Sequence, residues 1–353
     1  MIAVRLRGRS RCPPRASRHS GHGGRCADNT GVLDVLKVTF PFFALVLCGY
    51  LAASRRLLPL ESIGGLNTFV LYFALPCMLF RFGASLPVAR LFDPAVVVVW
   101  LPCALLMVAV TIRASLNGRI GWNDASFGAL VAAFPNTGFM GVPLLVALLG
   151  PGAAGPAIAT LLLDLVVTSS LCIALSRLDG AGHGGAAAAA AARKALQGVA
   201  LNPMPWAILL GGLASALGLE PVPPLAATIG LLGDAASPVA LFTIGAVLAR
   251  SQHQAAQSRA TLPLRDYLPV ALAKLLVHPL LVLAAGTGAV ALGLPLDPLA
   301  LTVLVLVAAL PSASNVSLLA ERFAADTGRI ARIILVTTAA AFFTFSGVVA
   351  LMA

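Results

Sequence analysis

Two apolar segments carry polar residues of the kinds that bind anions, each beside a proline. AAFPNTGFMGVP surrounds Pro135, and AALPSASNVSLLAE surrounds Pro311. Proline removes a backbone donor and clashes with the carbonyl four residues earlier, so each segment predicts a broken helix. An anion such as a carboxylate can sit at the positive end of a half-helix. The candidate substrate-binding residues are Pro135, Asn136, Thr137, Gly138, Pro311, Ser312, Ser314 and Asn315.

The amide and hydroxyl side chains at these breaks add further hydrogen-bonding groups for an anion. The Asn136 amide both donates and accepts hydrogen bonds, and Thr137 adds a hydroxyl. Broken backbone inside a bilayer is tolerated only where it is buried in protein or lines a wet cavity. If the two broken helices cross, Asn136 and Asn315 approach each other near the midplane. The alternative is two kinked helices whose polar side chains merely satisfy freed backbone groups.

Ionisable residues inside the apolar segments are few, and such residues are functional candidates. Asp164 lies in LLLDLVVTSS and is the candidate for proton or substrate coupling. Lys274 lies in LAKLLVHP with His278 one turn later; pairing with Asp164 and extension to the membrane interface both stay open. No second membrane-embedded acid is expected, which argues against a two-carboxylate sodium site. Asn67 is a further candidate, with helix packing as its alternative.

Motifs for catalysis and metal binding are missing from the sequence. The six cysteines show no C-x-x-C spacing, the five histidines are scattered, and no nucleotide-binding G-x-x-x-x-G-K-S/T occurs. We therefore expect no catalytic residue, no metal site and no cofactor, with coupling to protons or sodium left open. A membrane enzyme is the alternative of a different class, and it would need paired acids or an activated nucleophile.

The composition predicts an all-α integral membrane protein. Hydrophobic residues make up 59% of the chain and charged residues 10%, whereas soluble domains carry about 25% charged residues. A membrane-spanning helix needs about 20 apolar residues. Ten segments fit, at 33–53, 62–83, 94–113, 124–149, 155–176, 203–219, 222–249, 268–290, 297–322 and 328–352.

An internal repeat divides these segments into two halves. Residues 76–86 and 238–248 both follow the pattern P-x-x-L-F-x-x-G-A-x-L. The halves are 32–176 and 203–353, joined by an Ala/Gly-rich cytoplasmic linker at 177–202. Because each half holds five helices, an odd number, the second half is inverted relative to the first. Broken helices at corresponding places in inverted halves indicate the binding site of a transporter.

The distribution of basic residues predicts the orientation in the cell membrane. Cytoplasmic loops are enriched in Lys and Arg, so the odd-numbered loops are cytoplasmic and both termini lie outside. The alternate loops hold Arg90, and Arg81 if it is counted there. The odd-numbered loops hold thirteen basic residues: Arg55, Arg56, Arg113, Arg119, Arg177, Arg193, Lys194, Arg250, Arg259, Arg265, Arg322, Arg329 and Arg332. The net charge of +11 follows this loop pattern and indicates no nucleic-acid partner.

The basic extension at residues 1–31 does not fit this orientation. It contains seven arginines but no apolar run and no cleavage site, so it is not a secretory signal. One interpretation is a regulatory or lipid-binding arm. The other, which we favour, is that translation begins near Val32 and the extension is not translated or not ordered.

The motifs as a set resemble the auxin efflux carrier family, which includes plant PIN-type carriers and bacterial organic-acid permeases. They are LPCMLFRFGASL, FPNTGFMGVPLL, LNPMPWA, SPVALFTIG, KLLVHPL and LPSASNVSLLA, in order from about residue 33 to the C-terminus. The resemblance implies a fold shared with bile-acid symporters and sodium/proton antiporters, in which helices four and nine cross at the substrate site and one bundle slides against a scaffold. The residues that match the two crossovers and the start of helix six are Pro135, Asn136, Gly138, Pro311, Asn315, Asn202 and Pro203.

The expected function is secondary transport of a small organic anion by alternating access. The substrate is expected to be a carboxylate such as malonate, malate or an auxin-like acid. A sodium-coupled bile-acid-type or arsenite carrier on the same fold is the alternative. The expected partners are this substrate and membrane lipids, and a homodimer stays open.

Overall fold

The computed structural model describes residues 30–85, 93–177, 193, 197, 200–257 and 262–352. Most of the basic extension, most of the linker at 177–202 and Arg90 lie outside these residues. Within them all regular structure is helical, and the only strand-like feature is an isolated antiparallel bridge between Pro135 and Ser312. The prediction of an all-α membrane protein is confirmed, since seven helices of the described part are long and apolar enough to cross a membrane.

The helices follow the predicted segments. Three apolar helices of the described residues are shorter than a full crossing, at Thr137–Leu149, Pro203–Leu217 and Pro298–Ala309, so the count of ten crossings stays a prediction. The α-helices are α1 (Thr30–Ser54), α2 (Ser62–Phe69), α3 (Leu75–Ser85), α5 (Pro94–Ser115), α6 (Trp122–Ala133), α7 (Val142–Leu149), α8 (Ala154–Leu163), α9 (Ser169–Leu175), α11 (Pro203–Leu217), α12 (Pro223–Gln257), α13 (Leu268–Leu272), α14 (His278–Ala291), α15 (Pro298–Ala309), α16 (Val316–Arg322) and α17 (Thr327–Met352).

Three helices begin with the same local device, an Asp or Asn followed by proline. The side-chain oxygens of Asp93, Asn202 and Asp297 accept hydrogen bonds from the backbone N–H two residues later, at 2.9, 3.0 and 3.3 Å. Each cap satisfies a backbone donor that has no partner within the helix. Proline at the first helical position costs no hydrogen bond. These short signals fix where α5, α11 and α15 begin.

Several membrane helices contain a single widened π-turn. Such turns often mark functional sites. Three of them end two residues before a proline. In a regular α-helix the proline ring would clash with the carbonyl four residues earlier. The fourth has no such proline and begins at Asp164. The π-turns are η1 (Val70–Ala74), η2 (Thr137–Gly141), η4 (Asp164–Thr168) and η7 (Ala273–Val277).

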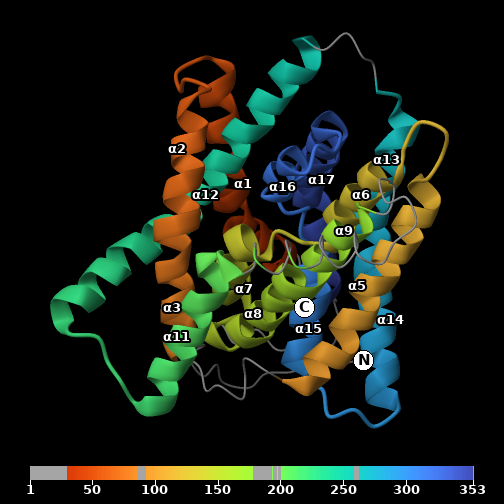
Figure 1. Cartoon of the computed structure of the whole chain (residues 1–353). Coiled ribbons are helices and arrows are strands. Elements are labelled where there is room, and N and C mark those ends of the chain that lie inside the picture. Colours follow the sequence, from red (N-terminus) through yellow and green to blue (C-terminus); the bar gives the residue numbers. More distant parts are fainter. Residues whose placement is uncertain are drawn as a thin grey trace, which may run out of the picture.

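The helices form two groups that lie side by side (Figure 1). The scaffold group contains α1, α2, α3, α11 and α12, in which α1 packs along α12 and α3 packs along α11. The crossover group contains α5 to α9 and α13 to α17. Its α17 packs on α1 and α12, its α7 contacts α1, and η2 contacts α12. The broken segment around η2 therefore lies at the boundary between the groups.

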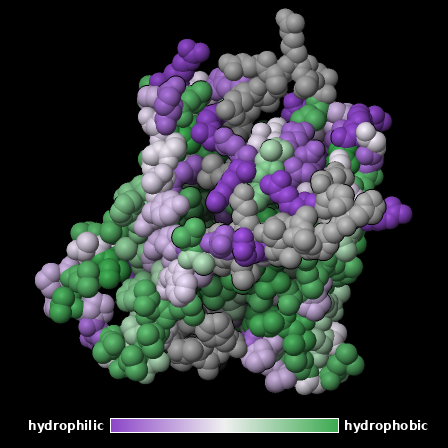
Figure 2. Space-filling model, in the orientation of Figure 1, coloured by the Kyte–Doolittle hydropathy of each residue, from purple (hydrophilic) through white to green (hydrophobic). Residues whose placement is uncertain are grey.

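The surface separates a hydrophilic end from a broad hydrophobic zone (Figure 2). Hydrophilic residues gather at the upper end of the view, toward the end at which α12 finishes. Below them the face is mostly hydrophobic. Large apolar side chains on several helices are solvent-exposed in the isolated chain, including Leu106, Leu213, Leu280 and Phe343. An apolar zone of this extent is suited to contact with lipid.

Glycines let the scaffold helices approach at backbone distance. A Cβ atom built on Gly49 of α1 would lie 1.8 Å from the carbonyl oxygen of Phe242 on α12. A Cβ atom built on Gly211 of α11 would lie 2.3 Å from the carbonyl oxygen of Phe80 on α3. Phe80 and Phe242 occupy the same position of the repeated motif. Small residues at helix interfaces are the usual device for close packing in membranes.

Replacing Gly49 by alanine is expected to destabilise the protein by about 1–3 kcal/mol, the range for overpacking a tight interface. The added methyl group meets backbone atoms of α12, which cannot rotate away as a side chain would. Thermal unfolding of the purified variant measures the effect. The matched control is Gly64→Ala on α2, where a Cβ would meet nothing within 4 Å. Equal stability of the two variants would contradict the prediction.

Candidate functional site

The two broken helices meet at their breaks. The backbone N–H of Asn136 donates to the carbonyl of Pro311 at 2.8 Å, and the N–H of Ala313 donates to the carbonyl of Phe134 at 3.0 Å. Phe134 and Leu310, which end α6 and α15, both have extended backbone. A short antiparallel pairing thus replaces helical hydrogen bonds where both chains unwind. We call this segment, residues 134–138 and 310–315, the crossover.

The polar side chains of the crossover have unused hydrogen-bonding capacity. The Thr137 and Ser312 hydroxyls and the side-chain carbonyl of Asn315 are buried and have no partner in the described part of the chain. The side chain of Asn136, a residue only 4% exposed, makes no hydrogen bond within the described residues. Buried polar groups normally find a partner. Three such groups at one place, beside the Asn136 amide, therefore point to a ligand.

Neighbouring residues hold the crossover in position. The backbone N–H of Ser312 donates to the Thr337 hydroxyl on α17 at 3.3 Å. A Cβ at Gly141 would lie 2.5 Å from a Leu310 methyl group, so the Leu310 side chain would have to shift. Gly138 differs, since its Cβ would make only ordinary contacts of 3.5 Å or more. Thr337 has no local signal in the sequence that would have identified it.

Asp164 is fully buried between helices of the crossover group. Its Oδ1 accepts hydrogen bonds from the Trp100 indole at 3.1 Å and from the Thr168 hydroxyl at 2.9 Å. Its Oδ2 has no partner in the described residues. Sequence reasoning missed Trp100, although an indole N–H inside an apolar segment needs an acceptor. That requirement was the available signal.

Lys274 is fully buried too, so the alternative that it extends to the membrane interface is wrong. Its Nζ donates to the carbonyl of Ala308 at 2.8 Å and lies 3.1 Å from Nδ1 of His278. Ala308 lies in the last turn of α15, directly before the break. A cation at the C-terminal end of a half-helix interacts favourably with the helix dipole. Lys274 therefore stabilises the half-helix that leads into the crossover.

Asp164 and Lys274 do not form a direct ion pair, because no contact within 4.0 Å joins them. They are connected through two rings: Trp100, which binds Asp164, lies 5.3 Å from His278 between ring centroids, and His278 contacts Lys274. The two charges, one in η4 and one in η7, thus belong to one buried cluster. This cluster lies next to the crossover through Ala308.

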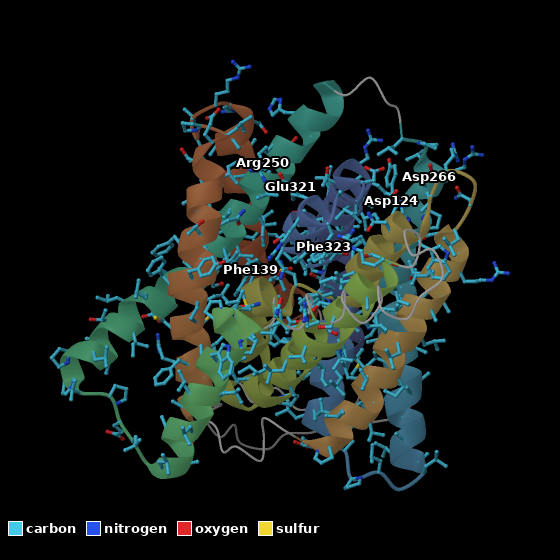
Figure 3. All side chains as sticks on the ribbon, viewed as in Figure 1. Asp124, Phe139, Arg250, Asp266, Glu321 and Phe323 are labelled. Atoms are coloured by element: carbon cyan, nitrogen blue, oxygen red, sulfur yellow. The ribbon has the colours of Figure 1, made fainter. Side chains whose placement is uncertain are left out.

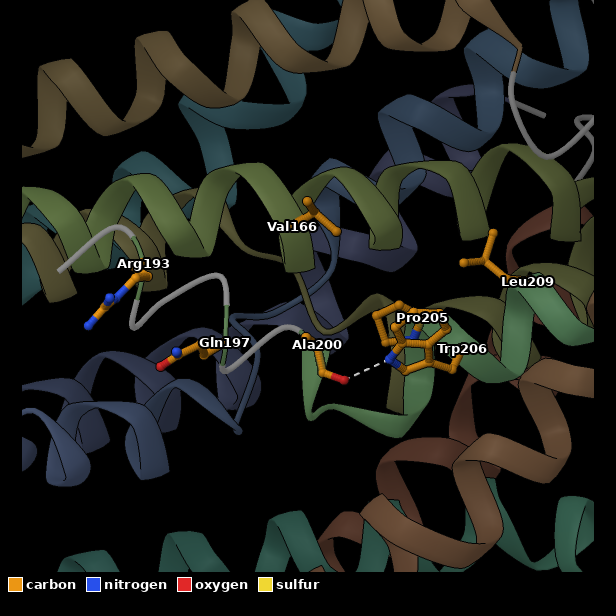
Figure 4. Close-up of a pocket in the computed structure, with 7 residues that line it drawn as sticks. All are labelled: Val166, Arg193, Gln197, Ala200, Pro205, Trp206 and Leu209. Atoms are coloured by element: carbon orange, nitrogen blue, oxygen red, sulfur yellow. Dashed lines mark hydrogen bonds between the residues drawn. The ribbon is translucent and has the colours of Figure 1, made fainter. Parts of the chain in front are cut away.

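Two features lie apart from this site. Asn67 is half-buried on α2, which packs against η1 and α12 in the scaffold group. A groove of about 470 Å³ runs between Val166 of η4 and Leu209 of α11, where the Trp206 indole donates to the carbonyl of Ala200 at 2.7 Å (Figure 4). Its surface is mostly apolar, with Arg193 and Gln197 also in the lining.

A buried arginine was also missed, because it was counted among the loop cations. Arg329, at the start of α17, is 1% exposed and donates to the backbone carbonyls of Asp266 at 2.7 Å and Asp124 at 2.8 Å. It also donates to the Ser115 hydroxyl at 3.1 Å. Asp124 and Asp266 lie at the same end of the molecule as Arg250 (Figure 3). Arg329 thus joins three chain segments of the crossover group at that end.

The expectation of a single membrane-embedded acid is wrong. Asp234 lies inside the apolar stretch Pro223–Arg250 of α12. Its Oδ1 is 2.6 Å from Nη1 of Arg81, which lies on α3 inside the apolar stretch Ser62–Ser85. No group of three or more His, Cys, Asp or Glu side chains that could hold a metal ion occurs among the described residues.

Comparisons with known proteins give the family. The family described as "Membrane transport protein" matches residues 34–182 and 187–349. A Rhizobium meliloti (strain 1021) protein named "Putative malonate transporter" is 29% identical over 320 residues, which cover 90% of this chain and 96% of that protein. "Auxin efflux carrier component 4" of Arabidopsis thaliana is 27% identical over 151 residues, which cover 42% of this chain and 24% of that protein. The family match covers most of the chain and both broken helices. This chain therefore belongs to the membrane transport protein family of the auxin efflux carriers, as its motifs predict.

Proposed function

We propose that the protein is a secondary transporter that moves a small organic anion across the cell membrane by alternating access. The observation that carries the proposal is the crossover, where two broken apolar helices are hydrogen-bonded to each other and polar side chains lack partners. Irregular backbone at membrane depth is tolerated where it is buried in protein or lines a water-filled cavity. Membership of a membrane transport family supports the same conclusion.

The substrate class follows from the chemistry of the crossover. The half-helix formed by η2 and α7 begins at Thr137, and the N-terminus of a helix favours negative charge. The side-chain amides of Asn136 and Asn315 can donate to carboxylate oxygens. The relatives named for malonate and auxin transport point to carboxylates too. Malonate, malate and auxin-like acids are therefore the substrates to test.

The mechanism that we propose is a sliding of the crossover group against the scaffold group. Two inverted repeats, at 32–176 and 203–353, would build both groups. The repeated motif supports this, because the backbone of each of its two phenylalanines receives a close glycine contact in the scaffold. Each contact joins helices from different repeats, α1 with α12 and α11 with α3. Substrate bound at the boundary between the groups would then face either side in turn.

Proton coupling through Asp164 is the energy source that we propose. Asp164 is buried and has one oxygen without a partner in the described residues. It belongs to the cluster that reaches the crossover through Lys274 and Ala308. A change of charge at Asp164 would therefore act on the end of the half-helix α15. Buried acids in membrane helices commonly serve as proton relays.

Ligand-dependent thermal stability of the purified protein tests the substrate class. We expect stabilisation by one of malonate, malate, pyruvate or indole-3-acetate, and about 2.7 kcal/mol at a concentration of 100 Kd. Taurocholate and sodium chloride are the other arms. Stabilisation only by sodium or taurocholate would favour a sodium-coupled bile-acid-type carrier. Absence of any carboxylate effect would contradict the proposal.

The basic, hydrophilic end of the molecule is the cytoplasmic end in this proposal, with both termini outside. In a variant without native cysteines, a cysteine at Gly118, in the exposed loop between α5 and α6, should react with an impermeant maleimide only after permeabilisation. A cysteine at Glu220, in the exposed loop between α11 and α12, should react in intact cells. The opposite pattern would invert the orientation.

A further inference from the structure

A cavity of about 320 Å³ lies between the two helix groups, apart from the crossover residues. The scaffold helices α3 and α12 form most of its wall, and the first turn of α7 closes it from the crossover group. This volume is at the lower end of the range for ligand pockets, about 300–1,000 Å³, so it suits a small acid. Its lining contains Met78, Arg81, Phe82, Ser85, Pro143, Gly233, Asp234 and Ser237 (the helices are seen in Figure 1).

Arg81 brings positive charge into this cavity and keeps donors free. Its two contacts in the described residues both use Nη1, which donates to Asp234 at 2.6 Å and to the carbonyl of Gly230 at 3.2 Å. Arginine has five N–H donors in a planar fork that fits a carboxylate with two parallel hydrogen bonds. The Arg81 side chain is 47% exposed. Its Nε and Nη2 groups can therefore reach a ligand.

The ion pair with Asp234 shows that the Arg81 guanidinium binds a carboxylate. Asp234 presents a carboxylate to the guanidinium, and its side chain is 74% exposed, so few contacts hold it there. An ion pair within two apolar membrane segments is costly unless it serves water, an ion or a substrate. Ser85 and Ser237 add hydroxyl donors to the same cavity. The cavity thus contains the groups of a carboxylate-binding site, and its cation, Arg81, is paired with the carboxylate of Asp234.

Pro143 connects this cavity to the transport machinery. It lies at the start of α7, directly after the π-turn η2 of the crossover. The cavity is therefore bounded by both groups, and any sliding of one group against the other changes its shape. A ligand held by Arg81 would lie against the half-helix that follows the crossover.

We propose that this cavity is a second carboxylate station on the substrate path, in which Arg81 binds the substrate and Asp234 competes with it for the guanidinium. The inference rests on the proposed function, because it concerns the same carboxylate substrate. It adds a specificity residue and an internal competitor outside the crossover. When substrate arrives, its carboxylate replaces that of Asp234 on Arg81, and Asp234 turns to solvent.

The competition predicts opposite effects for the two partners of one ion pair. Asp234→Asn removes the competing charge, so malonate binding should tighten roughly two- to fivefold, the range for releasing one exposed ion pair. Arg81→Gln removes the cation, so binding should weaken roughly tenfold or more, the range for a hydrogen bond to a charged group. Arg81→Lys keeps the charge but loses the fork, and its affinity should lie between those of Arg81→Gln and the unaltered protein.

Calorimetric titration of the purified full-length protein with malonate, at constant ionic strength, gives these dissociation constants, and thermal unfolding reports folding. A purely structural ion pair would make both Asp234→Asn and Arg81→Gln less stable and neither one tighter in binding. That result, or unchanged affinity in both variants, would overturn the station at Arg81. The proposed function fails separately, if the unaltered protein binds neither malonate nor the other carboxylates tested.

Discussion

Carboxylate uptake is expected to fall about 10- to 100-fold when Asn136 is replaced by alanine, while the protein stays folded in the membrane. The loss corresponds to about 1.5–3 kcal/mol, the usual contribution of a hydrogen bond to a charged group. The Asn136 side chain makes no hydrogen bond within the described residues, so its removal breaks no internal hydrogen bond there. Its backbone N–H still donates to Pro311, which preserves the pairing of the two breaks.

Asn315→Ala should reduce uptake to a similar extent, because its side-chain carbonyl is buried without a partner in the described residues and lies on the other side of the pairing. Initial rates of radiolabelled malonate uptake into proteoliposomes measure both effects. Asn67→Ala is the matched control, since it removes the same amide from α2, a scaffold helix, and should leave uptake near normal. Normal uptake in both crossover variants would remove the crossover as the substrate site.

The sequence was sufficient to locate the breaks because their causes are local. Pro135 and Pro311 each stand beside small polar residues at a break, whereas Pro102 and Pro238 lie inside continuous helices. Asp93 or Asn202 caps a helix through the next two residues. The apolar segments were found for the same reason. The pairing of Asn136 with Pro311 could be expected only from the corresponding positions of the two breaks and from the family resemblance.

The partners of the buried charges could not be predicted in this way. Lys274 binds the carbonyl of Ala308, a backbone atom that every residue carries and that no motif distinguishes. In the sequence Arg329 looks like one of the basic residues of a loop. In the structure its guanidinium donates hydrogen bonds to three segments that are distant in sequence. Asp234 was overlooked although it lies inside the predicted segment 222–249. Such contacts depend on how helices pack, which sequence periodicity does not specify.

The pH dependence of uptake is expected to flatten when Asp164 is replaced by asparagine. If Asp164 carries the coupled proton, an acidic exterior accelerates uptake by the unaltered protein. The asparagine side chain of the variant cannot titrate, so this acceleration should be lost. The substitution conserves shape, since the side-chain oxygen of asparagine can still accept from Trp100 and Thr168. We therefore expect little change in thermal stability. Thr168→Val is the control, because it removes one hydrogen bond to Asp164 and keeps the carboxylate.

Two uptake assays separate coupling from binding at this residue. The first imposes a proton gradient on proteoliposomes and measures malonate accumulation at external pH values from mildly acidic to mildly basic. The second measures exchange of internal for external malonate without a gradient. Asp164→Asn should lose accumulation but retain exchange, because the polar contacts of Asp164 in the described residues lead to the crossover indirectly, through Trp100, His278, Lys274 and Ala308. An unchanged pH profile would reduce Asp164 to a structural acceptor for the Trp100 indole, and loss of exchange as well would place the carboxylate in the binding site itself.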